Sequence, residues 1–300
     1  MQLTARAADL ASSLVAARPG LFSAHPLPDL IRRLDAVPRS VSYNKLPASV
    51  EETWGSIRRE LGADDLRSYQ AATMASLIAD FERRVAPLPV PKSVRDLFPG
   101  HFERILAQIE SDPDPASFEG EDFLKDLGLC RTTLLPAGAQ VINESPTLSR
   151  SLVYRSGVAQ FARFTALLLF VTRGSGPFYQ FHTHSRNLED FNEEGWERCY
   201  LRVAELLALN PRIKGIYGAT WFYDPEISRI SPRLAYLRGQ ALERGGASFY
   251  VGPDPGRLAI EKSKTRRDLY EKGEYVPTSY LIVLPRKGLL AWAEGRRGRA

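Results

Sequence analysis

Residues 177–223 read PFYQFHTHSRNLEDFNEEGWERCYLRVAELLALNPRIKGIYGATWFY, a pattern of strand, helix and strand. Residues 177–184 alternate aromatic and polar side chains, which is typical of a strand. Asn192 is a favourable N-cap, and the two glutamates after it suit the positive end of a helix dipole. Residues 213–223 are rich in β-branched and aromatic side chains and predict a second strand. The predicted helix has an inward apolar stripe at helical spacing: Trp196, Cys199, Val203, Leu206 and Leu207.

The same alternation continues on both sides of this stretch. Residues 129–142 predict a strand pair, and the apolar run 164–172 predicts a strand buried on both faces. Residues 1–127 instead carry apolar residues at helical spacing and predict a helical N-terminal region. We therefore expect an α/β (α+β) fold, a mixed β-sheet flanked by helices over residues 128–300, with a basic C-terminal end. Its remaining elements are a helix opened by Ser231-Pro232, strands at 247–251 and 278–284, and a helix at 259–272.

The composition excludes several classes of protein. Two cysteines, Cys130 and Cys199, are too few for a disulfide framework or a four-thiolate zinc site, and neither has a nucleophile's context. The N-terminus lacks the apolar core of a signal peptide, and no apolar run is long enough to cross a bilayer. We expect a cytoplasmic, bacterial-type protein without a membrane span.

The net charge of +5 is concentrated at one end of the chain. Residues 286–300 hold five basic residues and one acid, a net charge of +4, so residues 1–285 carry only +1. Nucleic-acid enzymes usually spread basic residues over a whole face. Nucleic acid is therefore an improbable partner by this criterion, and a small-molecule substrate is expected. The oligomeric state is not determined by the sequence.

A glycine-rich loop follows the predicted strand 164–172. Arg173, Gly174, Ser175 and Gly176 could bring backbone N–H groups and one positive charge close to a phosphate. The alternative is a tight hairpin turn, for which Gly-Ser-Gly is equally suitable.

Two stretches resemble the GNAT superfamily of acyl-CoA N-acyltransferases: FTALLLFVTRGSGPF (164–178) and KTRRDLYEKGEY (264–275). Arg173, Gly174 and Gly176 match the family's pyrophosphate loop, and residues 270–273 match its helix motif. The resemblance implies a GNAT-like domain, acyl-CoA as co-substrate held by residues 173–176, and Tyr270 as the general acid that protonates the departing thiolate. For Tyr270 the alternative is an aromatic residue at a helix end that packs on the sheet.

The segment GPFYQFHTHSRNLE contains two histidines on one strand face. His182 and His184 could share a metal ion with Glu189, since the spacing is also that of the first cupin motif. A remaining ligand would come from Asp190, Glu193, Glu194 or His101. The same histidines or Glu189 could instead act as the base that takes a proton from an attacking amine. Ordinary hydrogen bonding of the histidines to backbone is the third possibility.

The end of the strand 213–223 gives a further candidate. Trp221, Tyr223 and Arg229 could bind a planar or anionic substrate, because ligands of α/β sheets bind beyond the carboxyl ends of strands. A core strand followed by a polar loop is the alternative. Three hypotheses follow: an N-acyltransferase that moves an acyl group from a thioester to an amine, a metal-dependent, cupin-like oxygenase, and a non-catalytic binding protein.

Overall fold

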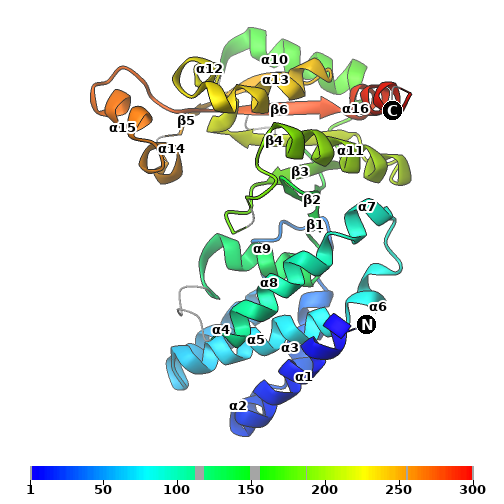
Figure 1. The fold of residues 1–300 in the computed structure, drawn as a ribbon, viewed down its shortest axis with the longest axis vertical. Coiled ribbons are helices and arrows are strands. Elements are labelled where there is room, and N and C mark those ends of the chain that lie inside the picture. Colours follow the sequence, from blue (N-terminus) through cyan, green and yellow to red (C-terminus); the bar gives the residue numbers. More distant parts are fainter. Residues whose placement is uncertain (1, 112–117, 149–155, 187, 255, 299–300) are drawn as a thin grey trace. The chain divides into compact units, whose positions relative to one another are not determined.

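In the computed structural model the described residues are 2–111, 118–148, 156–186, 188–254 and 256–298. They fall into two units. Figure 1 shows the fold coloured along the sequence. The first unit comprises Met1–Ala137, Val141–Glu144 and Thr183–Leu188, and the second comprises Gly138–Gln140, Ser145–His182 and Glu189–Ala300. Helices and a mixed set of six strands occur together, which confirms the predicted α/β class.

The first unit is built around α5 (Ala63–Ala79), which is buried on nearly all sides. Alanines such as Ala71, Ala72 and Ala75 allow α1 and α4 to approach its backbone closely. A short antiparallel hairpin of β1 (Leu135–Pro136) and β2 (Val141–Ser145) confirms the predicted strand pair. The other helices of this unit are α1 (Gln2–Ala17), α2 (Pro19–Ala24), α3 (Leu27–Asp35), α4 (Ala48–Glu60), α6 (Phe81–Val85), α7 (Lys92–Arg95), α8 (Phe98–Glu110) and α9 (Gly120–Cys130).

The second unit contains a sheet with the strand order β3-β4-β6-β5. Strands β3 (Phe178–His182) and β4 (Gly215–Thr220) are parallel, and α11 (Glu193–Leu209) connects them. Strand β6 (Thr278–Pro285) pairs antiparallel with both β4 and the edge strand β5 (Ala247–Pro253). These elements confirm the predicted strand-helix-strand unit and the two later strands.

Helices cover both faces of this sheet. On one face, α10 (Gly157–Ala166) and a π-helical turn (η4, Leu167–Val171) place Phe164 and Leu167 against Phe178 and Phe249. On the opposite face Phe181 contacts Trp196 and Tyr200 of α11. The remaining elements are η5 (Trp221–Tyr223), α12 (Ile227–Ile230), η6 (Pro232–Leu234), α13 (Ala235–Glu243), α14 (Arg257–Glu261), α15 (Lys264–Glu271) and α16 (Arg286–Arg297).

The predicted buried strand over residues 164–172 is wrong, because this stretch is the helix α10 with its π-helical turn. Alanine, leucine and glutamine favour a helix, and an apolar run alone does not distinguish a strand from a helix. Cys130 likewise ends a helix rather than beginning a strand. Strand β4 stops at Thr220 because its hydroxyl accepts a hydrogen bond from the Phe222 N–H (3.3 Å) and starts a 3₁₀ turn.

The basic C-terminal end is part of the fold. It forms α16, whose Leu289 and Ala293 are buried. Arg286 donates hydrogen bonds to the carbonyls of Leu207 and Asn210 at the end of α11. Over the described residues, no helix has the length and apolar character needed to span a membrane.

Candidate active site

The central feature of the second unit is the short ladder between the parallel strands β3 and β4. The β3–β4 ladder contains only the pairs Tyr179–Ile216 and Gln180–Tyr217, although both strands continue. We call the stretch beyond these pairs, Phe181–His182 on β3 and Gly218–Ala219 on β4, the strand opening. On its other edge β4 stays paired with β6 as far as Thr220. In this stretch Phe181 and Gly218 are buried, and Ala219 is exposed.

One side of the strand opening is packed with aromatic rings. A Cβ at Gly218 would lie 3.2 Å from the Tyr223 hydroxyl oxygen and 3.5 Å from the Phe181 Cβ. A side chain at position 218 would displace the Tyr223 ring, so glycine permits this packing. Burial raises the pKa of Tyr223, which is 3% exposed, so its hydroxyl stays neutral.

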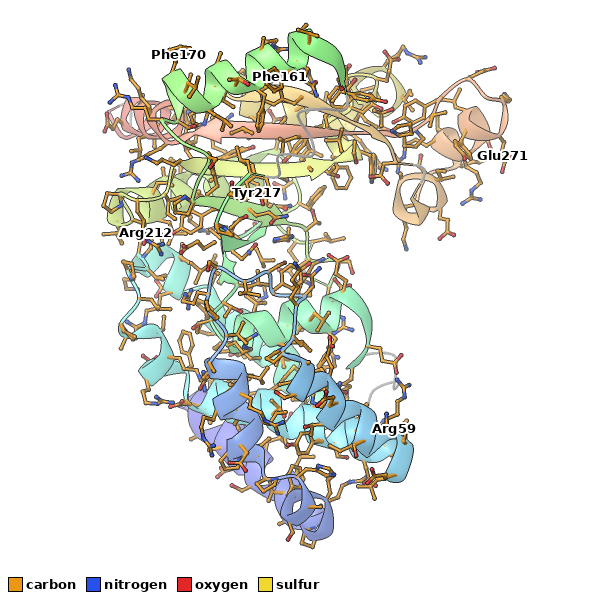
Figure 2. All side chains as sticks on the ribbon, turned by 180° about the vertical axis from the view of Figure 1, so that it is seen from behind. Arg59, Phe161, Phe170, Arg212, Tyr217 and Glu271 are labelled. Atoms are coloured by element: carbon orange, nitrogen blue, oxygen red, sulfur yellow. The ribbon has the colours of Figure 1, made fainter. Side chains whose placement is uncertain are left out.

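Polar groups lie on the opposite side of the sheet, next to the last β3–β4 pair. The Tyr217 hydroxyl oxygen is 2.9 Å from Gln180 Oε1 and 2.9 Å from Ser145 Oγ. Burial raises the pKa of Tyr217, whereas the Ser145 contact opposes the rise. Tyr217 is drawn in Figure 2 at the middle of the sheet. These neutral donors and acceptors can bind an uncharged polar group.

Two of the predicted catalytic residues flank the α11 end of the sheet. His182 is the last residue of β3 and is half-buried, whereas Glu189 is exposed. Asn192 Oδ1 accepts the Gly195 N–H at 2.9 Å, as predicted for the N-cap. Because Glu193 and Glu194 occupy the first turn, this helix end disfavours an anion such as pyrophosphate.

The predicted aromatic substrate wall is part of the core. Trp221 and Tyr223 are buried, and the Arg266 guanidinium carbon lies 4.4 Å from the Trp221 ring centroid. Arg229 is exposed and pairs with Glu226 at 3.0 Å. The structure therefore does not bring Arg229 and the two aromatic side chains together as one exposed surface.

Next to these rings is a buried carboxylate that sequence reasoning missed. Asp224 Oδ2 accepts hydrogen bonds from the Tyr275 hydroxyl (3.0 Å) and the Thr278 N–H (3.2 Å). Burial and the Asp224 charge raise the pKa of Tyr275. The sequence signal was available, since Asp224-Pro225 follows a predicted strand. A cavity of about 310 Å³ lies beside it, lined by Phe222, Asp224, Pro225, Ile227, Ser228, Ala235, Arg238 and Gly239.

The glycine loop lies before β3, at the amino end of that strand. The Gly174 N–H donates to the Leu168 carbonyl (2.8 Å), and the Ser175 carbonyl accepts the Leu148 N–H (2.9 Å). Arg173 has a positive φ of 51°, and a Cβ at Gly176 would lie 2.3 Å from the Pro146 carbonyl oxygen. These contacts give the loop a structural role, and its N–H at Gly174 is not available to a phosphate.

Tyr270 lies on α15, with 37% of its surface exposed. That helix packs through Leu269 on the cluster around Trp221 and Tyr275. Within residues 264–275 the buried, hydrogen-bonded hydroxyl belongs to Tyr275. The residue predicted as the general acid, Tyr270, lies five positions earlier. Figure 1 shows α15 beyond the end of the sheet.

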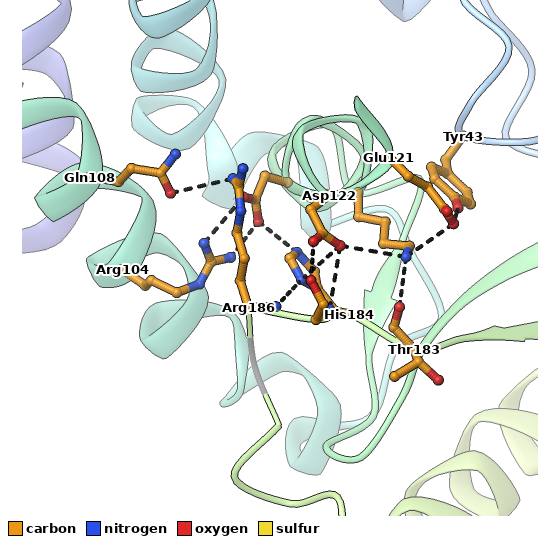
Figure 3. A network of polar contacts seen from close by, with 11 residues as sticks. Tyr43, Arg104, Gln108, Glu121, Asp122, Thr183, His184 and Arg186 are labelled. Carbon is orange, nitrogen blue, oxygen red and sulfur yellow. Dashed lines mark hydrogen bonds and ion pairs between the residues drawn. The ribbon is translucent and has the colours of Figure 1, made fainter. Parts of the chain in front are cut away.

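His184 belongs to a buried polar network in the first unit (Figure 3). Its Nε2 lies 2.8 Å from Asp126 Oδ1, and its Nδ1 accepts the Arg186 N–H at 3.3 Å. This pattern assigns the proton to Nε2 and leaves neither ring nitrogen with a lone pair for a metal or a substrate proton. His184 therefore acts structurally in this arrangement.

Asp126 is the centre of this network. Besides His184 it accepts hydrogen bonds from Arg104 and from Arg186 Nη1, the latter at 2.9 Å. Burial alone would raise the pKa of Asp126, but these hydrogen bonds and the Arg104 charge outweigh burial and hold the pKa well below its usual range. The network fixes His184 and Arg186 to α8 and α9.

A second branch of the network is centred on Lys125. Its ammonium donates to the Thr183 carbonyl at 2.7 Å and lies 3.0 Å from Glu121 Oε1. Tyr43 donates to the same Glu121 oxygen at 2.7 Å. Lysine and aspartate adjacent in a predicted helix gave no sequence signal for this network, because its partners are distant along the chain.

Metal ligation by His182, His184 and Glu189 finds no support in this geometry. In the part of the chain that the structure describes, no group of three or more histidine, cysteine or acidic side chains could hold a metal ion. Comparison with known proteins gave no match to a protein-family model, to a curated protein or to a solved structure. The functional argument therefore rests on the chain's own geometry.

Proposed function

We propose that the second unit is an N-acyltransferase that moves an acyl group from an acyl-CoA-type thioester to an amine. The observation that supports the proposal is the strand opening, where the β3–β4 ladder ends while both parallel strands continue. The pantetheine arm of such a thioester is an extended chain with two amide groups. It can therefore hydrogen-bond to a strand edge as an added strand does. The resemblance to the GNAT superfamily points in the same direction.

The reaction needs a base and an acid near the thioester. The amine nitrogen attacks the thioester carbonyl, loses a proton, and the C–S bond breaks to release the thiolate, which is then protonated. His182 is our candidate base, because it ends β3 at the strand opening and an imidazole titrates near neutral pH. Tyr217 and Tyr270 are the two candidate acids, the first beside the opening and the second from the family resemblance.

The charge near α11 bears on how the donor binds. The first turn of α11 carries Glu193 and Glu194, which favour a cation such as a protonated amine and repel pyrophosphate. The proposal therefore assigns recognition of the donor to its pantetheine arm. S-acetyl-pantetheine should bind within about tenfold of acetyl-CoA, a difference of about 1.4 kcal/mol.

The experiment is calorimetric titration and thermal shift with acetyl-CoA, a longer acyl-CoA and S-acetyl-pantetheine. Ala219→Phe would cover the strand opening and should abolish binding, because Ala219 is exposed on β4 beside it. Ala8→Phe, the same change at an exposed position of α1, is the matched control and should bind as wild type. Absence of heat and of a thermal shift with every thioester would contradict the proposal.

Kinetics of single variants separate the candidate acids. Once an amine acceptor is found, Tyr217→Phe and Tyr270→Phe are compared at saturating donor. The variant that lacks the general acid should have a kcat lower by about 10²-fold or more. His182→Gln should remove the limb of the kcat/KM profile that reports the base.

A further inference from the structure

The outer side of α10 and its π-helical turn is apolar and exposed. Val158, Leu169, Phe170 and Val171 are 85%, 61%, 78% and 52% exposed, and we call these four residues the apolar helix face. Phe170 is labelled on this helix in Figure 2. Several large, exposed apolar side chains on one helix mark a surface that binds something.

The inner side of the same helix is fully used by the fold. Phe164 and Leu167 pack on the sheet, and the Gln160 amide exchanges two hydrogen bonds of 2.8 Å with the backbone of Tyr250 on β5. The helix is thus fixed with the apolar helix face outward. Rotation of the helix to bury that face would break the two Gln160 hydrogen bonds and expose Phe164.

The charge around this helix is of one sign. Residues 156–182, the described part of this segment in the second unit, contain two arginines and no aspartate or glutamate. Arg163 and Arg173 are the arginines of α10 and the loop after its π-helical turn, and both are exposed. By contrast, α11 carries exposed acids and bases together, for example Glu194 with Arg198. Exposed apolar side chains with arginines and no acid in the same segment are the pattern of helices that lie in the headgroup region of anionic membranes.

We propose that the apolar helix face docks on an anionic lipid surface. Leu169, Phe170 and Val171 enter the boundary between headgroups and acyl chains, while Arg163 and Arg173 contact lipid phosphates. A second copy of this chain fits the face less well, since two such helices would bring arginines together with no acid between residues 156 and 182 to neutralise them. This inference does not depend on the acyltransferase proposal.

The experiment is flotation of the full chain with phosphatidylcholine vesicles, with and without phosphatidylglycerol. We expect binding to the anionic vesicles that weakens with added salt. Leu169→Ser should reduce the partition coefficient by about tenfold or more, the effect of losing one buried leucine side chain. Leu61→Ser, at a 46% exposed leucine of the first unit, is the matched control and should bind as wild type.

Charge is tested in the same assay. Arg163→Gln combined with Arg173→Gln should weaken binding to anionic vesicles, whereas Arg59→Gln, at another exposed arginine (Figure 2), should not. The proposal is overturned if neither vesicle binds, if Leu169→Ser and Leu61→Ser behave alike, or if light scattering shows a dimer that Leu169→Ser dissociates. Thermal melting of each variant verifies that it is folded.

Discussion

Buried His101 should make the stability of the first unit depend on pH. Burial and the nearby Arg104 charge lower the pKa of His101 from 6.5 to about 4, and the His184 ring lies 6.3 Å away between centroids. Between pH 6.5 and about pH 4 this histidine is therefore mainly protonated in the unfolded chain and mainly neutral in the folded chain. Since the unfolded state binds more protons, stability falls as the pH falls through this window.

The size of the effect follows from the two pKa values. Between pH 7 and pH 5 the free energy of unfolding should drop by about 2 kcal/mol through His101 alone. His101→Leu removes the titrating group at similar volume. Between pH 7 and pH 5 the free energy of unfolding of this variant should therefore fall by about 2 kcal/mol less than that of the wild type. The carboxylates of Asp122 and Asp126, whose pKa values are also lowered, contribute only at lower pH.

The measurement is urea unfolding at pH 7 and pH 5, followed by circular dichroism and by tryptophan fluorescence. Trp54 is the tryptophan of the first unit, and the other three lie in residues of the second. His25→Gln, which leaves His101 in place, is the control and should keep the wild-type loss. Equal losses in wild type and His101→Leu would refute the reasoning.

Three further predictions follow from burial and close approach. Asp126→Asn removes the buried anion that pairs with the partly exposed Arg104 and Arg186 and should cost about 1–3 kcal/mol in urea unfolding at pH 7. Gly195→Ala would put a Cβ 2.0 Å from the Asp190 carbonyl oxygen and should cost about 1–3 kcal/mol, whereas Gly239→Ala, facing open space, should stabilise by about 0.5–1 kcal/mol in thermal melts. Burial raises the pKa of Cys199 to about 12, so alkylation of this thiol at pH 8 should occur only after unfolding, as followed by mass spectrometry.

The sequence predicted most of the second unit because its signals are local. The Asn192 cap, the inward stripe of α11 and the strands of the sheet all depend on neighbours a few residues apart. Within residues 1–127, predicted to be helical, Met74, Leu77 and Ile78 recur at helical spacing and are buried in α5. Cap chemistry and periodicity act within one element, so one element's residues are enough to reveal them.

Only the tertiary structure determined the polar network and the role of residues 164–172. The partners of Asp126 lie 22 to 60 residues away along the chain, so no local pattern joins them. The apolar run 164–172 reads the same in a strand and in a helix, and packing of Phe164 and Leu167 on the sheet selects the helix. That selection leaves the neighbouring Leu169 and Phe170 facing outward, because a helix in contact with one sheet buries a single side.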